Sequence, residues 1–175
     1  MTKLNIGVVG QGGRGIGMMA TLAAMEDVHI SAICDIRPEC MKKGNEYLME
    51  NHGYTAKEYL DFHDLVDDKD VDAVFVPSAW ENHVPTALYA MRQGKRVATE
   101  VGGACDLNDC WDLVRTSEQT GIPFMMAENC CYDVCEQTLL HMTRQGLFGE
   151  LVYCTGGYEH CLQDEIGNGD RTGHY

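Results

Sequence analysis

Residues 4–15 read Leu-Asn-Ile-Gly-Val-Val-Gly-Gln-Gly-Gly-Arg-Gly. The first six of these residues form a short, mostly apolar run with β-branched side chains, which predicts one buried strand of a parallel sheet. Gly10, Gly12 and Gly15 follow in the spacing G-x-G-x-x-G, and apolar residues then recur at roughly helical spacing from Ile16 to Met25. The glycines therefore stand between a strand and a helix, which is the context in which this motif predicts dinucleotide binding.

Each glycine of the motif has its own expected role. Gly10 allows a tight turn after the strand, Gly12 lets a pyrophosphate approach the backbone, and Gly15 lets the helix pack close to the strand. The start of the helix offers free N–H groups and a positive dipole end to the phosphates. The predicted cofactor contacts of this loop are Gly10, Gln11, Gly12, Gly13, Arg14 and Gly15.

A second strand, predicted over residues 28–34, ends at Asp35. This residue follows Gly15 by about 20 positions, the offset at which an acidic side chain meets the adenosine ribose of a bound dinucleotide. A carboxylate there repels a 2′-phosphate, so the sequence favours NAD over NADP. Arg37 lies two residues further on and could soften that preference. The alternative interpretation is a simple glycine turn with an N-capping aspartate nearby.

The remaining segments alternate between helix and strand, which predicts an α/β fold with a doubly wound parallel sheet of the Rossmann type. We expect this domain over residues 1–128 and the beginning of a second α/β domain, a substrate and oligomerisation domain, over 129–175. Helices are expected over 38–52, 84–93, 107–120 (capped by Asp106) and 132–145, with a small helix within 54–70. Further strands are expected over 71–76, 95–99, 124–127 and 151–158.

Composition restricts the class of partner. The 175 residues carry a formal net charge of −14, which argues against nucleic acid or an anionic membrane as a partner. No apolar run is long enough to span a bilayer, and the N-terminus predicts no signal peptide. Nine cysteines, an odd number, predict reduced thiols in a cytoplasmic protein. Cys130, Cys131 and Cys135 lack metal-ligand spacing, so we expect core packing and no metal site.

Further candidate contacts follow the predicted strands, because ligands bind at the carboxyl ends of open parallel sheets. Three candidate cofactor contacts also have an alternative structural role. His83 could be a helix-start residue bonded to the backbone, Trp80 a surface aromatic residue, and Glu100 a helix cap. Tyr158 and His160 alternate in a strand pattern, so both point to one face. If that face is the cleft, Tyr158 can act as acid or base and His160 can orient it; if it is not, both are ordinary sheet residues. The candidate cofactor contacts are Ser78, Trp80, Asn82, His83, Glu100, Val101 and Asn129.

Taken together, these motifs resemble the glucose-fructose oxidoreductase, inositol dehydrogenase and rhizopine-catabolism (Gfo/Idh/MocA) family. The resemblance rests on residues 6–15, Asp35, 76–83, 94–97 leading to Glu100, and 144–151. It implies an NAD(P)-dependent oxidoreductase that transfers hydride between the nicotinamide and a sugar or polyol-like substrate. It also implies a second domain with a large open sheet, here only begun, that carries much of the substrate pocket and makes the full-length protein a homo-oligomer.

One loop departs from the family pattern. Where the family often has Glu-Lys-Pro, this chain has Glu100-Val101-Gly102, and a valine cannot relay a proton. The middle of the chain is similar to the NAD-using glycosidases of the superfamily, known as α-N-acetylgalactosaminidases, in which NAD is recycled through oxidation, elimination and return of hydride. That pattern implies that residues 80–83, Glu100, Val101 and Asn129 line the NAD and that Tyr158 meets the sugar. A catalytically silent NAD-binding protein is the third possibility.

Overall fold

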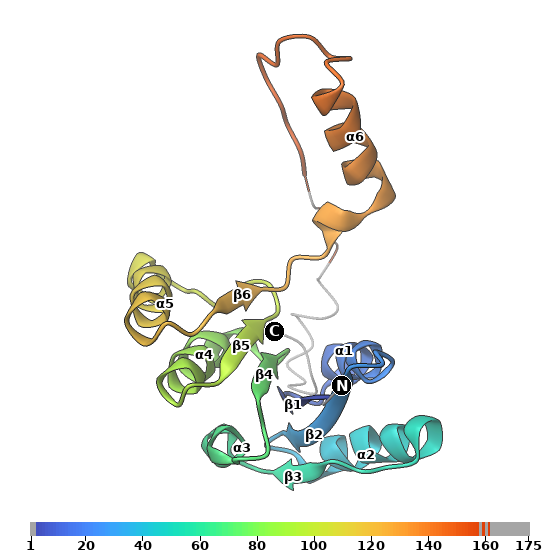
Figure 1. Ribbon diagram of the computed structural model, residues 1–175, viewed down its shortest axis with the longest axis vertical. Helices are drawn as coiled ribbons and strands as arrows, with labels where there is room; N and C mark the ends of the chain where they lie inside the picture. The colour runs from blue at the N-terminus through green and yellow to red at the C-terminus, as the bar shows by residue number, and fades with distance from the viewer. Residues whose placement is uncertain (1–2, 158, 160, 162–175) are drawn as a thin grey trace. The chain divides into compact units, whose positions relative to one another are not determined.

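The computed structural model describes residues 3–157, 159 and 161. The described residues form two units, of which the first ends at Ala127 and the second begins at Glu128 (Figure 1).

The first unit is built on a six-stranded, entirely parallel sheet with the order β3-β2-β1-β4-β5-β6. This is the strand order of the doubly wound dinucleotide-binding fold, so the predicted fold class is confirmed. The strands are β1 (Leu4–Val9), β2 (Val28–Cys34), β3 (Lys57–Tyr59), β4 (Ala73–Val76), β5 (Arg96–Thr99) and β6 (Phe124–Met126).

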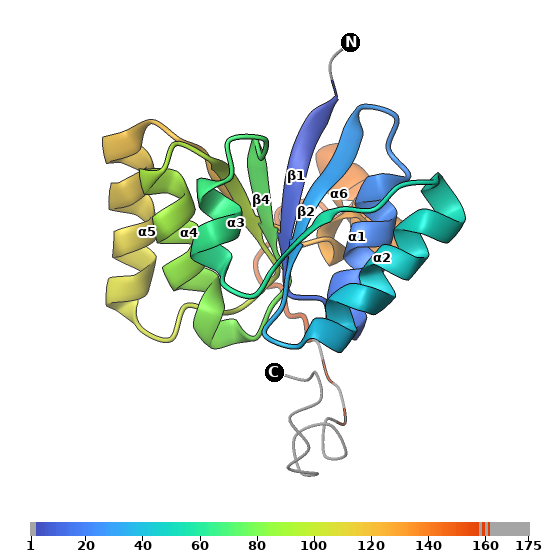
Figure 2. The same cartoon turned by 90° about the horizontal axis from the view of Figure 1, so that it is seen from below.

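Helices cover both faces of this sheet (Figure 2). One face carries α1 (Gly13–Ala23) and α2 (Pro38–His52), and the other carries α3 (Phe62–Asp67), α4 (His83–Arg92) and α5 (Leu107–Thr120). Two apolar clusters follow from this layering: α1 and α2 contribute Met19 and Leu48 to the first, whereas α3 and α4 contribute Leu65 and Met91 to the second. Burial of strand side chains on both faces accounts for the nearly continuous apolar runs of β1 and β2.

Helix ends follow the local sequence. Pro38 occupies the first turn of α2, where its missing N–H costs nothing, and Gly53 ends that helix in the left-handed conformation (φ 76°). The side chain of Asp106 caps α5 by accepting a hydrogen bond of 2.9 Å from the backbone N–H of Asp109. The predicted bounds of α2 and α5 are confirmed.

The strand β3 was not predicted. Its sequence is Lys-Glu-Tyr, it has three residues, and it forms the edge of the sheet. A short, charged edge strand protects the sheet against pairing with other chains, but it carries none of the apolar runs or alternation by which buried strands are recognised. The predicted small helix within 54–70 corresponds to α3, in the second half of that range.

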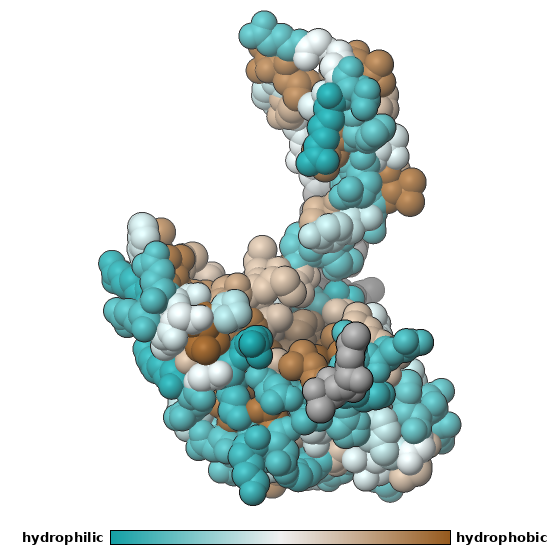
Figure 3. Space-filling view, viewed as in Figure 1, coloured by the Kyte–Doolittle hydropathy of each residue, from teal (hydrophilic) through white to brown (hydrophobic). Residues whose placement is uncertain are grey.

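The second unit contains the short 3-10 helix η2 (Cys130–Tyr132) and the helix α6 (Val134–Arg144). The strand predicted over 151–158 is wrong for the part that the structure describes, because residues 151–157 are in no strand. A strand is defined by hydrogen bonds to a neighbouring strand, and none of the described residues of this unit supplies one. Apolar side chains are exposed on this unit (Figure 3): Val134, Leu139, Leu140, Leu147, Phe148 and Leu151.

Within the described part of the chain, no helix has both the length and the apolar character needed to cross a bilayer.

A charged cluster joins β3 to the loop before β4. The Nζ of Lys57 lies 2.9 Å from Oδ2 of Asp68 and 2.8 Å from Oδ2 of Asp70, and the hydroxyl of Tyr59 donates to Asp68 at 2.8 Å. Burial alone would raise the pKa of Asp68. Hydrogen bonds from the Asp70 backbone N–H, Lys57 and Tyr59 outweigh burial and hold the pKa at about 2, below the ordinary 3.8. The carboxylate form therefore stabilises the fold.

We expect the contribution of Asp68 to depend on pH. Because its pKa is lower in the folded chain than in the unfolded one, its contribution is complete above about pH 4 and is lost as the pH falls towards about 2. At pH 7, Asp68→Asn should lower the free energy of unfolding by roughly 1–2 kcal/mol, a value reduced by solvent screening of the exposed lysine. Urea unfolding at neutral and acid pH measures the effect.

Asp70→Asn is the matched control, because it removes the other carboxylate that pairs with Lys57. The side chain of Asp70 is 56% exposed. We expect a much smaller loss of stability from it. An equal loss for Asp68→Asn at pH 7 and at pH 2 would contradict the assignment.

Candidate functional site

The topology places a crevice at the carboxyl edge of the sheet. β1 pairs with β2 on one side and with β4 on the other, and the helices that follow β1 and β4 lie on opposite faces (Figure 2). The loops after β1 and β4 therefore diverge, and ligands of doubly wound folds bind at such a switch point. The predicted contacts of the first unit lie in the loops after β1, β2, β4 and β5 or in the first turns of the helices that follow β1 and β4.

The loop after β1 depends on the absence of side chains at two glycines. Gly10 has a φ of +108°, and a β carbon there would lie 2.7 Å from the Cα of Ser78. At Gly15, a β carbon would overlap the carbonyl oxygen of Gly10. Gly10 thus permits contact with the loop after β4, and Gly15 permits the first turn of α1 to lie directly against the end of β1.

The start of α1 is suited to a phosphate. Gly12 is the N-cap residue, and among the described residues no side chain caps this end. A β carbon at Gly13 would meet no described atom within 4 Å, so the backbone of the first turn is open. The uncapped N–H groups and the positive end of the helix dipole attract an anion. Arg14, in the same turn, has a side chain that is 55% exposed and adds a positive charge.

Asp35 connects the loops after β1 and β2. Its Oδ2 accepts a hydrogen bond of 2.8 Å from the backbone N–H of Gln11, and its Oδ1 accepts one of 2.9 Å from the backbone N–H of Arg37. The Nε of Arg37 lies 3.7 Å from the same Oδ1. A carboxylate offers about four acceptor positions, so two backbone bonds fix the side chain and leave capacity for the hydroxyl groups of a ribose.

The side chain of Gln11 points into the protein. It is 1% exposed, and its Oε1 lies 2.5 Å from the place that a β carbon of Gly44 in α2 would occupy. Neither polar atom of its amide group has a hydrogen-bond partner among the described residues. The structure therefore places Gln11 beneath the loop, where its side chain packs against α2 and its backbone N–H bonds to Asp35.

The loop after β4 continues into the 3-10 helix η1 (Trp80–Asn82) and then into α4. Trp80 and Asn82 are exposed, whereas His83 is 1% exposed, with Nε2 2.9 Å from the carbonyl oxygen of Ser78. His83 thus makes the backbone contact of its alternative role, a helix-start residue bonded to backbone, and its contact with the cofactor stays a prediction.

Glu100 follows β5 and reaches across to α1. Its backbone N–H donates to the carbonyl oxygen of Val76 at 3.1 Å, which keeps the ends of β4 and β5 together. Its Oε1 accepts a hydrogen bond of 2.8 Å from Nη2 of Arg14, and the two side chains form an ion pair. This pair joins the helix after β1 to the loop after β5, on which Val101 is half-buried.

Other sequence-predicted residues lie apart from this group. Asn129 is the N-cap residue of η2 in the second unit. Tyr158 and His160 lie outside the described residues. Among residues 3–157, 159 and 161, no group of three or more His, Cys, Asp or Glu side chains is arranged to hold a metal.

Cys34 ends β2 beside Asp35 and is buried. Burial raises the pKa of its thiol to about 12, and the negative charge of Asp35 adds to the rise. The thiol stays protonated at neutral pH and is a poor nucleophile. The residue is therefore a core side chain and no candidate for covalent catalysis.

Gly102 and Gly103, which follow Val101, were not among the contacts predicted from the sequence. Both have positive φ values, +81° and +88°, and both lie against side chains of the loop after β4. Two adjacent glycines in the loop that follows a strand were the available signal, because such a pair permits left-handed backbone at close contacts.

A family model described as "Oxidoreductase family, NAD-binding Rossmann fold" matches residues 4–128. The chain belongs to this family, the Gfo/Idh/MocA oxidoreductases. Its first unit is an NAD-binding Rossmann domain, and the glycine loop, the uncapped start of α1 and Asp35 fit that cofactor.

Relatives of this Gfo/Idh/MocA chain include glycosidases. Over 98% of its length it is 35% identical to glycosyl hydrolase family 109 protein 2 of Phocaeicola vulgatus, of which it covers 42%. Over 93% of its length it is 37% identical to the alpha-N-acetylgalactosaminidase of Bacteroides fragilis, of which it covers 39%. The chain thus spans about two fifths of the length of these relatives.

A solved structure shows the same fold as the Gfo/Idh/MocA chain. Scyllo-inositol dehydrogenase from Lactobacillus casei, with bound cofactor NAD(H) and scyllo-inositol, matches 85% of this chain and 43% of that chain with a TM-score of 0.77. The two sequences are 22% identical, so this likeness concerns the fold alone.

Two glycines of α1 provide a matched test of the loop. Gly15→Ala should destabilise the chain by roughly 2 kcal/mol or more and weaken NAD binding, because its β carbon overlaps backbone that cannot move aside. At Gly17, in the same helix, a β carbon meets no described atom within 4 Å. Gly17→Ala should therefore raise stability by about 0.5–1 kcal/mol and leave NAD binding unchanged. Thermal unfolding and calorimetric titration with NAD measure both effects, and equal behaviour of the two variants would refute the interpretation.

Asp35→Asn tests the charge while keeping one acceptor oxygen. We expect NAD affinity to fall about tenfold or more, and the free energy of unfolding to fall by about 1–2 kcal/mol as the bonds to Gln11 and Arg37 weaken. Asp27→Asn, an exposed aspartate before β2, is the control and should change neither quantity. Titrations with NAD and with NADP check the result, and an unchanged ratio of the two affinities would show that Asp35 does not select the cofactor.

Proposed function

We propose that this chain holds the cofactor in an enzyme that transfers hydride between NAD and a carbon of a sugar or polyol. The observation that carries the proposal is the fixed carboxylate of Asp35, held by two backbone N–H groups beside an uncapped helix start. Because the chain spans about two fifths of its relatives, the substrate pocket is assigned to the longer protein.

Cofactor choice follows from charge. The Asp35 carboxylate accepts hydrogen bonds from the two hydroxyls of an adenosine ribose, whereas a 2′-phosphate in the same place would meet like charge and offer no donor. The guanidinium of Arg37 is already engaged with Asp35 at 3.7 Å. These contacts support NAD over NADP.

Arg14 and Glu100 have different roles in the proposed cofactor site. When bound, NAD supplies a hydride acceptor at its nicotinamide ring. Arg14, more than half exposed at the start of α1, can meet a diphosphate without leaving the protein surface. Glu100, buried and bonded to the end of β4, holds the loop that bears Val101.

A second candidate activity is glycoside hydrolysis in which NAD is recycled. The observation in its favour is Val101, which stands where the oxidoreductases of this family often carry a proton-relaying lysine. An aliphatic side chain cannot take a hydroxyl proton, so net alcohol oxidation by that relay is disfavoured. The Bacteroides fragilis relative named alpha-N-acetylgalactosaminidase supports the same candidate.

Two further expectations remain proposals. A cytoplasmic location is supported by the nine cysteines, all of which are free thiols. A homo-oligomer of the longer protein is supported by the exposed apolar side chains of the second unit, because such surfaces are often buried in protein–protein interfaces.

The two candidate activities differ in their products. Incubation of the longer protein with NAD and an aryl α-N-acetylgalactosaminide should release the aryl alcohol without net NADH if the glycosidase proposal is correct. Incubation with free sugars or inositols should instead give NADH, measured at its near-ultraviolet absorbance, if net oxidation is correct. Asp35→Asn should lower either rate about tenfold at subsaturating NAD, through cofactor binding. NAD binding with neither product would support a catalytically silent protein.

A further inference from the structure

The two adjacent glycines after β5 accommodate side chains from the loop after β4. A β carbon at Gly103 would overlap the Cβ of His83 and lie 2.7 Å from its Cγ and 2.8 Å from its Nδ1. A β carbon at Gly102 would lie 3.0 Å from both Cε2 and Nε1 of Trp80. His83 and Trp80 therefore occupy space that any other residue pair at 102 and 103 would need.

The ring of His83 has a defined orientation. Its Nε2 lies 2.9 Å from the carbonyl oxygen of Ser78, which can only accept, so Nε2 carries the proton. Its Nδ1 is buried and has no partner among the described residues. A buried nitrogen without a partner lowers stability, so folding stability alone does not account for a histidine here.

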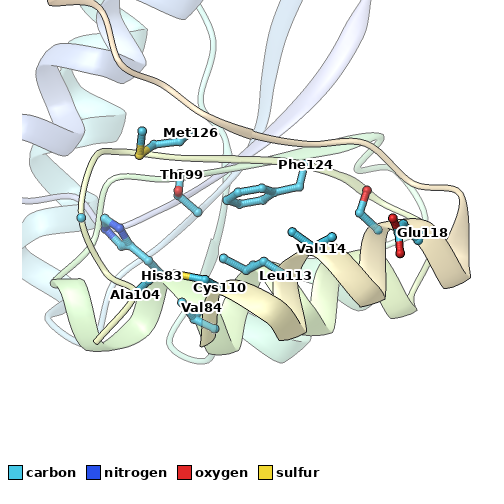
Figure 4. Close-up of a pocket in the computed structure, with 12 residues that line it drawn as sticks. His83, Val84, Thr99, Ala104, Cys110, Leu113, Val114, Glu118, Phe124 and Met126 are labelled. Carbon is cyan, nitrogen blue, oxygen red and sulfur yellow. The ribbon is translucent and has the colours of Figure 1, made fainter. Parts of the chain in front are cut away.

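The loop over residues 100–104 is not fixed by packing on every side. A cavity of about 420 Å³ adjoins Gly102, Ala104 and His83 and continues along α5. Figure 4 shows His83 and Ala104 at one end of this cavity, with Leu113 and Val114 of α5 along its length. Because this side is hollow, the contacts with Trp80 and His83 restrain the loop at Gly102 and Gly103, beyond the bonds that Glu100 makes with Val76 and Arg14.

Ser78 extends these contacts to the glycine loop. A β carbon at Gly10 would lie 2.7 Å from the Cα of Ser78, and the carbonyl oxygen of Ser78 bonds to His83. Backbone and ring atoms are thus in direct contact from Gly10 through Ser78 and His83 to Gly103. The loops after β1, β4 and β5 are held at fixed separations by this row of contacts.

We propose that His83 is a positioning residue that sets where Glu100 and Val101 stand relative to the glycine loop. It does so by filling the space over Gly103 while its Nε2–H is bonded to Ser78. This differs from the first of the two roles that the sequence left open, in which the imidazole itself touches the cofactor. The inference rests on the proposed function, in which Glu100 and Val101 are candidate NAD contacts, and it assigns them to the half of NAD that ADP lacks.

The test compares NAD with ADP. ADP carries the adenosine and diphosphate that meet Asp35 and the start of α1, but it has no nicotinamide half. Gly103→Ala should displace the loop from His83 and weaken NAD binding about tenfold, a loss of about 1.4 kcal/mol. The same variant should leave ADP affinity within about twofold, so the ratio of the two affinities, measured by calorimetry, falls.

Gly94→Ala is the matched control. Gly94 has a φ of +78°, similar to the +88° of Gly103, but a β carbon there would meet no described atom within 4 Å. Both variants share the strain of a left-handed alanine, and Gly103→Ala adds the overlap with His83. The ratio of NAD to ADP affinity should stay unchanged in Gly94→Ala. An equal ratio in the two variants would overturn the proposal.

Variants of His83 keep the test decisive if Gly103→Ala does not fold. His83→Gln retains an N–H donor for Ser78, and His83→Leu does not. We expect Gln to preserve more of the NAD to ADP ratio than Leu, and the Nε2–H tautomer of His83 to be seen in ¹⁵N spectra. Equal ratios for Gln and Leu, or an Nδ1–H tautomer, would overturn the proposal. Failure of the unchanged chain to bind either nucleotide would overturn the proposed function, and this inference with it.

Discussion

The contact between the carbonyl of Gly10 and Gly15 is the constraint on which the first unit depends. Because Gly15 has no side chain, the first turn of α1 lies directly on the end of β1. That approach sets the direction of α1, and the direction of α1 decides where its uncapped N–H groups point. It also places Gln11 within hydrogen-bond distance of Asp35, 2.8 Å from nitrogen to oxygen. One missing side chain thus fixes the position of the phosphate end and the ribose end of the same site.

The sequence predicted those parts of the fold that are determined locally. β1, β2, α2 and α5 have the expected bounds, because apolar runs, a first-turn proline, a capping aspartate and terminal glycines each act within a few residues. β3 escaped prediction because its place in the sheet comes from pairing with β2, and its three residues carry no apolar pattern of their own. Such a strand is determined by pairing between segments that are distant in sequence, and local sequence patterns do not reveal that pairing.

The same distinction between local and long-range determinants applies to the site. The glycine spacing and the offset of Asp35 are properties of one βαβ unit and could be predicted. The ion pair of Arg14 with Glu100 joins residues that are 86 positions apart, and the burial of His83 depends on a glycine in a different loop. Motif spacing gives the neighbourhood of such residues, but packing decides whether a side chain faces a ligand or another loop. The strand expected over 151–158 was wrong within its described part for a related reason, since an extended segment becomes a strand only beside a partner.

The double attachment of Asp35 has a consequence for how this protein can change. The carboxylate that would distinguish one cofactor from another is also the acceptor that orders the backbone at Gln11 and Arg37. A substitution that admits a 2′-phosphate therefore also releases two backbone N–H groups next to the glycine motif. One side chain therefore determines both the coenzyme preference and the order of the local backbone. A natural or engineered variant that uses the phosphorylated coenzyme must therefore also provide a new hydrogen-bond acceptor for those amides.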